Sequence, residues 1–227
     1  MKKLLLVTAL VLGFVSNAFA ERPQISMGVS GTFGLLDATG HETLGSTLVA
    51  SKRTEKEMPI AFASIFAEVG FMDRLRIGVE YVPHSLESET SQNVRAKSTT
   101  SADADLGAVK TNNIQIDVKD LSTLYASLYI KNGFFITGGV MEGDLITNEL
   151  LETGSQYGNS TLKGTTIGIG FERELDNGVF IRSQVNQMEF DNLSLRSSVA
   201  NSSGGFNLIE VKDLSGVSAR LSVGKTF

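Results

Sequence analysis

The charged residues best placed to do chemistry in this chain occupy the polar face of short segments whose opposite face is apolar. Six of them share this property: Glu68, Arg76, Glu80, Glu172, Arg182 and Arg220. Successive side chains of a strand point to opposite faces, so we expect these acids and bases to face one enclosed interior. Unpaired charges are very costly there, so ion pairs that plug the interior and fix the strand register are predicted. The alternative is a narrow, gated ion path whose selectivity these residues set.

The two histidines of the chain offer little for catalysis. His41 and His84 lie in separate polar segments, and only the run from His84 to Glu87 holds the residue types of a hydrolytic triad. The members of a triad are recognised by converging geometry, not by adjacency in the chain, and two separated histidines do not make a metal site. We therefore expect no enzymatic activity, no metal and no cofactor. A lipid-modifying enzyme at the outer rim is the least favoured alternative.

The elements that must position the six charges are predicted to be strands. Apolar and polar residues alternate with a period of two in eight segments, as in strands with one apolar face. These segments lie at about 25–36, 60–71, 75–82, 123–130, 134–142, 167–172, 179–186 and 215–227. The fifth is less regular, because Gly138 and Glu142 share the face of Ile136.

The connections between these strands alternate between short and long. Short turns are predicted at 72–74, at Asn132-Gly133 and at 176–178, and both residues of an Asn-Gly pair accept positive φ. The other connections are polar and are predicted to be loops, at about 37–59, 84–113, 145–160 and 190–206. Tight turns on one side and long loops on the other are typical of an outer-membrane barrel with an even number of strands.

The chain also contains an internal repeat. Residues Ile116–Ser122 (I-D-V-K-D-L-S) recur as Ile209–Ser215 (I-E-V-K-D-L-S), and each copy leads into a predicted strand. The same offset aligns the apolar faces of those two strands. We interpret the repeat as two similar four-strand halves, either by duplication or by chance similarity among strand-rich segments. In both cases the fourth and eighth strands are predicted to begin outside the membrane and to lengthen the barrel.

The two ends of the chain indicate its location. Basic Lys2 and Lys3, an apolar run and Ala18-Phe19-Ala20 are typical of a signal peptide at residues 1–20, exported through the Sec pathway, which leaves a domain at 21–227. The segment 215–227 alternates strictly and ends on an aromatic residue. It resembles the C-terminal signature of bacterial outer-membrane proteins, which the barrel-assembly machinery reads. The resemblance implies an assembly signal formed by Leu221, Val223 and Phe227, although Lys225 departs from the family pattern.

Composition excludes several classes of protein. The chain has no cysteine, so it has no disulfide framework. Its net charge of −5 argues against nucleic acid as a partner. No apolar run after the signal peptide is long enough for a transmembrane helix. The third predicted loop is acidic, and we consider three interpretations: binding of divalent cations that bridge lipopolysaccharide, repulsion of neighbouring molecules, or a simple solvated loop. Its acids are Glu142, Asp144, Glu149 and Glu152.

Together these features resemble the small outer-membrane β-barrels of Gram-negative bacteria, typified by the OmpA transmembrane domain and OmpX within the porin-superfamily architecture. The resemblance implies an all-β, eight-stranded antiparallel up-and-down transmembrane barrel with short periplasmic turns and long extracellular loops. It also implies a monomer in contact with outer-membrane lipid and lipopolysaccharide. We expect a structural or surface-interaction role, with loops that meet an extracellular ligand or phage. The alternatives are a narrow pore or transport protein for ions or small solutes, which a count of ten or more strands would favour, and a secreted soluble sandwich.

Overall fold

The computed structural model describes residues 23–43, 52–71, 74–88, 90–96, 109–151, 156–200 and 206–227, and its regular elements are strands. The predicted signal peptide at 1–20 lies outside these described residues. Within them, no helix has the length and apolar character needed to span a membrane.

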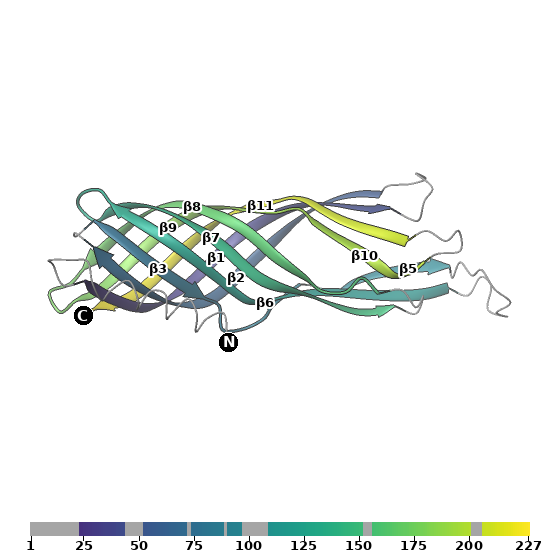
Figure 1. Cartoon of the computed structure of the whole chain (residues 1–227), viewed down its shortest axis with the longest axis horizontal. Coiled ribbons are helices and arrows are strands. Elements are labelled where there is room, and N and C mark those ends of the chain that lie inside the picture. The colour runs from purple at the N-terminus through teal and green to yellow at the C-terminus, as the bar shows by residue number, and fades with distance from the viewer. Residues whose placement is uncertain are drawn as a thin grey trace.

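Eight of the strands form a closed antiparallel ring, as predicted (Figure 1). The ring follows the order β1, β2, β3, β6, β7, β8, β9 and β11, and β11 pairs with β1 to close it. The strands are β1 (Gln24–Thr43), β2 (Lys52–Phe71), β3 (Leu75–Tyr81), β4 (Leu86–Glu87), β5 (Ser91–Ala96), β6 (Val109–Tyr129), β7 (Phe134–Leu151), β8 (Ser160–Glu174), β9 (Val179–Phe190), β10 (Leu193–Ala200) and β11 (Phe206–Thr226).

Tight hairpin turns and the C-terminus gather at one end of the ring, which we call the turn end (Figure 1). Asn132 and Gly133 both have positive φ, 55° and 83°, in the hairpin between β6 and β7, as the Asn-Gly pair predicts. Gly178 has a φ of 78° in the hairpin between β8 and β9, and its amide donates to the carbonyl oxygen of Leu175 at 2.9 Å. The amide of Phe227 donates to the carbonyl oxygen of Ile25 at 2.8 Å, which ties the last strand to the first.

The outside of the ring next to the turn end is an apolar band. Every ring strand contributes exposed large apolar side chains to it, and Ile167 and Ile169 are exposed to 65% and 66%. Soluble monomers rarely expose a continuous apolar surface of this kind, so the band is suited to an apolar solvent. Its residues include Met27, Val29, Phe33, Ile65, Ile77, Leu124, Leu128, Ile136, Val140, Ile181, Val185, Val217, Leu221 and Val223.

Strands β6 and β11 carry the same β-bulge at the limit of the apolar band that lies away from the turn end. We use 'above' for the direction away from the turn end and 'below' for the direction toward it. Asp120 and Asp213 adopt left-handed φ values of 52° and 55°, and the pairing register shifts beside each of them. The two aspartates occupy equivalent positions in the repeated sequence. A bulge adds one residue to one strand, and a shift of one residue exchanges the two faces of a strand.

The consequence of the bulge is an inversion of faces. On β11, Val217 and Leu221 face outward below the bulge, whereas Ile209 and Val211, at positions of the same parity, pack inside above it. On β6, Leu124 faces outward while Val118 packs inside. The repeated sequence is therefore the point at which an apolar face turns from the outside to the interior.

The left-handed conformation at Asp213 leads to a testable prediction. This conformation costs most L-residues about 1–2 kcal/mol, and glycine adopts it without this cost. We expect Asp213→Val to lower the free energy of unfolding by about that amount relative to Asp213→Gly, measured by urea unfolding of the refolded barrel. The same two substitutions at Glu189, the partner of Ser215 in a regular part of β9, should give the opposite order, because glycine weakens a strand. Equal stabilities at position 213 would contradict the role of the bulge.

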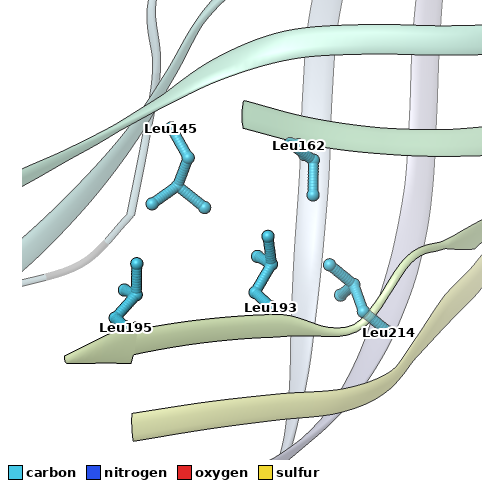
Figure 2. Packing of buried hydrophobic residues seen from close by; sticks show 5 residues of the cluster. All are labelled: Leu145, Leu162, Leu193, Leu195 and Leu214. Atoms are coloured by element: carbon cyan, nitrogen blue, oxygen red, sulfur yellow. The ribbon is translucent and has the colours of Figure 1, made fainter. Parts of the chain in front are cut away.

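Above the bulges the strands continue as an extension with its own leucine core. Leu145 of β7, Leu162 of β8, Leu193 and Leu195 of β10, and Leu214 of β11 point toward one another in Figure 2. Because these residues are packed inside, the extension is held together like the core of a soluble domain and not by lipid.

The extension corrects the predicted loops. Strands β1 and β2 reach Thr43 and Lys52, β7 reaches Leu151, and β10 lies within the predicted loop at 190–206. Strands β4 and β5 lie within the predicted loop at 84–113 but pair only with β6. They do not add a hairpin to the ring, so the ring keeps eight strands. The predicted elongation of the fourth and eighth strands agrees with the lengths of β6 and β11, each of 21 residues.

Candidate functional site: a closed lumen and an open seam

Arg182 of β9 lies at the centre of a buried network inside the ring. Its Nη1 and Nη2 donate to the two carboxylate oxygens of Glu68 on β2, at 2.7 and 2.8 Å. Its Nε and Nη2 donate to Oε2 of Glu172 on β8, at 2.9 and 2.7 Å. Only 4% of the Arg182 side chain is exposed. One guanidinium therefore holds two carboxylates that come from separate parts of the ring.

Three further side chains complete the network. Nη1 of Arg76 on β3 lies 2.9 Å from Oε1 of Glu172 and 3.7 Å from Oε2 of Glu68. The hydroxyl of Tyr125 donates to Glu68 at 2.7 Å, and the hydroxyl of Tyr129 donates to Glu172 at 2.7 Å. Two acids, two bases and two tyrosines thus cross the lumen from β2 to β9, and the charges balance.

Aromatic rings enclose the centre of this network. The guanidinium carbon of Arg182 lies 5.4, 5.4 and 5.1 Å from the ring centroids of Phe66, Phe135 and Phe180. Phe135 and Phe180 are almost completely buried. Each of these two rings lies against a glycine on a neighbouring strand, Gly170 and Gly224, where a Cβ atom would overlap the ring. The rings therefore fill the lumen beside the charges and keep water away from them.

A second ion pair lies closer to the extension. Nη1 of Arg220 on β11 lies 2.5 Å from Oε2 of Glu80 on β3. Ser64 donates to the other oxygen of Glu80, and Nε of Arg220 donates to Thr32 at 3.3 Å. Glu80 is buried and Arg220 is largely so. The six charges predicted from alternation thus lie inside the ring in two groups, each with balanced charge.

The two tyrosines of the network were not predicted from the sequence. Tyr125 and Tyr129 occupy the inward positions of β6, between the outward residues Leu124, Ala126 and Leu128. The alternation in the sequence did place both of them on the polar face of the predicted strand at 123–130. A tyrosine hydroxyl that faces a confined interior needs a polar partner.

The structure places the other predicted residues outside this network. Leu221, Val223 and Phe227 lie on the outer face, and Phe227 is 73% exposed. His41 lies on β1, opposite Glu210 of β11, while His84 lies after the end of β3. Among the described residues, no group of three or more acidic, histidine or cysteine side chains is suited to hold a metal ion.

The four acidic residues of the predicted third loop are only partly described. Glu142 and Asp144 belong to β7, where Glu142 pairs with Ser122 of β6. The side chain of Glu149 and all of Glu152 lie outside the described part. The lipopolysaccharide hypothesis for this segment therefore stays a prediction.

The ring has one incomplete junction, between β2 and β3. Their pairing runs from Phe71 and Leu75 to Ile65 and Tyr81 and then ends, although β2 extends to Lys52. Beyond Tyr81 the chain continues as β4 and β5, which pair with β6. In the described part of the chain, no strand pairs with this side of β2 at residues 52–64. We call the break between β2 residues 52–64 and the described residues 82–88 and 90–96 the seam.

Two prolines and a histidine mark the seam. The amide of Ala63 points into it and donates to Nε2 of His84 at 3.3 Å. Backbone groups of a strand alternate in direction, so position 59 also points its nitrogen into the seam. Pro59 has no amide hydrogen to donate there. Pro83 stands on the opposite side, directly after the last residues of β3. Both prolines suit an unpaired strand edge.

The seam joins two apolar environments. Pro59, Ala61 and Ala63 are exposed on the outer face of β2. On the inner face, Ile60 and Phe62 pack against a buried apolar group that also contacts Leu36, Leu86, Val118 and Phe190. The buried members of this group, which we call the upper interior, are Val82, Leu121, Met141 and Met188. The wall of the barrel is therefore unpaired at a place where both of its sides are apolar.

Comparison with known proteins supports the fold. No protein-family model matches the chain, and no curated protein sequence matches it. Among solved structures, the outer membrane protein OprG from Pseudomonas aeruginosa has a TM-score of 0.53 at 14% identity, covering 89% of this chain and 95% of that one. At this identity, the likeness shows that the chain has the fold of an outer-membrane barrel protein.

Two other solved structures are less similar. Ail from Yersinia pestis, determined with the heparin analogue sucrose octasulfate, has a TM-score of 0.39 at 10% identity and covers 89% of this chain and 99% of that one. AlkL, determined in DMPC lipid bilayers, has a TM-score of 0.38 at 10% identity and covers 88% of this chain and 90% of that one.

Proposed function

We propose that the chain is an integral outer-membrane barrel whose axis is closed to water and ions and whose role is structural or in surface interaction. The apolar band supports this location, because it suits lipid. Export through the Sec pathway with a signal peptide at 1–20 and insertion by the barrel-assembly machinery through Leu221, Val223 and Phe227 belong to the proposal. So does a monomer in contact with lipopolysaccharide, similar in architecture to the OmpA transmembrane domain and OmpX.

The observation that carries the closed axis is the network around Arg182. Eight strands leave an interior just wide enough for side chains. Here the space holds a paired guanidinium, two carboxylates and the rings of Phe66, Phe135 and Phe180. A hydrated ion would have to displace paired, buried charges, which is costly. Balanced charge also provides no attraction for ions of either sign.

Conductance tests the closed axis. We expect the refolded mature chain to show heat-modifiable migration on a gel and no steady current in a planar bilayer. Stable, ion-selective current steps would overturn the closed axis and favour the narrow pore. In that case Arg182→Ala should change the ion selectivity, while Arg173→Ala, an exposed arginine at the end of β8, should leave the current unchanged.

The extension supports the surface role. Strands β1, β2, β6, β7 and β11 continue beyond the apolar band, and the leucine core packs their inner side. A packed core gives the outer ends of these strands a rigid base, which suits contact with an extracellular ligand, a phage or neighbouring lipopolysaccharide. Binding of lipopolysaccharide to the purified barrel, measured by native mass spectrometry, tests the last of these partners.

The seam favours a second candidate function, the sideways passage of small apolar molecules. A molecule within the upper interior could reach the membrane through the seam without crossing the ion-pair network, since both sides of the wall are apolar there. Such a route needs no aqueous pore. It would carry apolar solutes and exclude ions.

Cross-linking tests this second candidate. The double variant Glu57→Cys/Glu87→Cys places one thiol on each side of the seam, and the natural chain has no cysteine to interfere. We expect a short bifunctional thiol reagent to abolish uptake of an apolar dye by proteoliposomes. The matched control is Asp37→Cys/Ser215→Cys, which joins paired positions on the closed junction of β1 and β11. Equal uptake with the seam cross-linked would exclude the sideways route.

A further inference from the structure

The seam has a histidine where the rest of the ring has backbone pairing. Nε2 of His84 accepts the amide hydrogen of Ala63, which would otherwise face the open edge of β2. The imidazole is on the β3 side of the seam and the amide is on β2, so the contact spans the break. We propose that His84 is a pH-sensitive latch, which holds the seam closed when the imidazole is neutral and releases it when the imidazole is protonated.

The contacts of His84 define which protonation state of its imidazole closes the seam. Nδ1 lies 3.2 Å from the carbonyl oxygen of Ser85. A carbonyl oxygen only accepts, so Nδ1 carries the hydrogen of this bond. Nε2 must then be unprotonated to accept from Ala63. The neutral imidazole with its hydrogen on Nδ1 satisfies both neighbours at once.

Protonation removes the contact across the seam. The imidazolium carries hydrogens on both nitrogens, so Nε2 loses its capacity to accept and points a hydrogen at the amide hydrogen of Ala63. The bond to Ser85 survives, because Nδ1 keeps its hydrogen. The imidazole therefore stays bonded to Ser85, on the β3 side of the seam, and separates from β2. Among the residues that the structure describes, no strand pairs with this side of β2 at this point to compensate for the loss.

Histidine is suited to this role, because its charge changes between pH 5 and 8. The side chain of His84 is exposed. The neighbouring elements carry other titratable groups: Glu57 on β2, Tyr81 on β3, Glu87 on β4, and Asp117 and Asp120 on β6. The hydroxyl of Tyr81 donates to Asp120 at 2.7 Å, which holds that pair on the β6 side of the seam. A test must therefore separate His84 from these groups.

Distance measurements between spin labels provide this test. Labels on Glu57→Cys and Glu87→Cys report the width of the seam in lipid nanodiscs, and they remove the same two carboxylates from every variant. With His84 present, we expect a narrow distance distribution at pH 8 and a longer, broader one at pH 5. With His84→Gln, whose amide oxygen accepts without titrating, the distribution should stay narrow at both values. With His84→Ala it should be broad at both.

The other histidine of the chain is the matched control. His41→Gln should keep the full pH response, because His41 lies on β1 and pairs toward β11 and the far end of β2. A distribution that does not change with pH in the presence of His84 would overturn the latch. So would a response that persists in His84→Gln, because the remaining carboxylates would then be its cause.

The latch rests on the sideways passage only for its biological purpose, and the two can fail separately. If the seam opens with pH but apolar dye never enters proteoliposomes, the latch stands and the second candidate function fails. If dye uptake occurs but is equal in His84→Gln and His84→Ala at both pH values, the passage stands and the latch fails.

Discussion

Arg182→Ala is expected to lower the free energy of unfolding of the barrel by about 3–5 kcal/mol, the cost of leaving a buried charge without its partner. The substitution leaves the carboxylates of Glu68 and Glu172 in a water-excluded site with Arg76 as the nearby base. It also removes the group that the surrounding aromatic rings enclose. Urea unfolding in detergent, followed by gel migration without heating, measures the effect.

Two other arginines calibrate this prediction. Arg173→Ala, on the exposed outer side of β8, should change stability by less than about 0.5 kcal/mol. Arg220→Ala should fall between the two, because it leaves only Glu80 unpaired and Arg220 is less buried than Arg182. Adding Glu172→Gln to Arg182→Ala should recover part of the loss, since one of the two buried charges is then removed. If Arg182→Ala is no worse than Arg173→Ala, the network does not stabilise the barrel.

Deletion of Phe227 is expected to prevent most of the protein from reaching the outer membrane while changing the stability of the refolded barrel little. The side chain is 73% exposed, so it contributes little to packing. Its amide gives one hydrogen bond to Ile25, which is worth about 0.5–1.5 kcal/mol. The amount of heat-modifiable barrel in isolated outer membranes measures assembly, and urea unfolding of refolded protein measures stability.

Phe134→Ala is the control for this deletion. Phe134 is another exposed aromatic residue at the turn end, with its ring 5.2 Å from that of Phe171. It lies outside the last strand, so its loss should leave assembly intact. Normal outer-membrane levels of the deletion variant, or an equal defect in Phe134→Ala, would exclude a specific role for Phe227 as the assembly signal.

Alternation made the membrane-facing part of the fold predictable from the sequence. Inside the apolar band each strand separates a uniform lipid-type environment from a polar interior. The alternation of apolar and polar residues is therefore enough to place Ile169 on the outer face and Arg182 on the inner face. The pairing partners were not predictable, because they depend on the stagger of strands around the ring. Nothing local in the sequence indicates that Glu80 meets Arg220 from the other end of the chain.

Apart from the predicted elongation of the fourth and eighth strands, the extension was missed, also for a physical reason. Above the bulges the outer face is polar and the apolar residues turn inward, so strands such as β10 have the composition of surface loops. The bulge that causes this change is a single additional residue, and a repeated Asp-Leu-Ser is a weak sign of it. The seam was not predicted either: Pro59 suits an unpaired strand edge, but nothing in the sequence of β2 indicates where its pairing with β3 stops.

The face-inverting bulges also set the hydrophobic thickness of the protein. Without the bulge, the apolar face of β11 from Ile209 to Val223 would face lipid over about 50 Å of strand, at roughly 3.3 Å per residue. Even with a tilt of about 40°, this length exceeds the apolar band of about 25 Å typical of outer-membrane barrels. With the bulge, only Val217–Phe227 faces outward, which matches that band. The bulges at Asp120 and Asp213 therefore keep the hydrophobic thickness of this long barrel close to that of a thin bilayer.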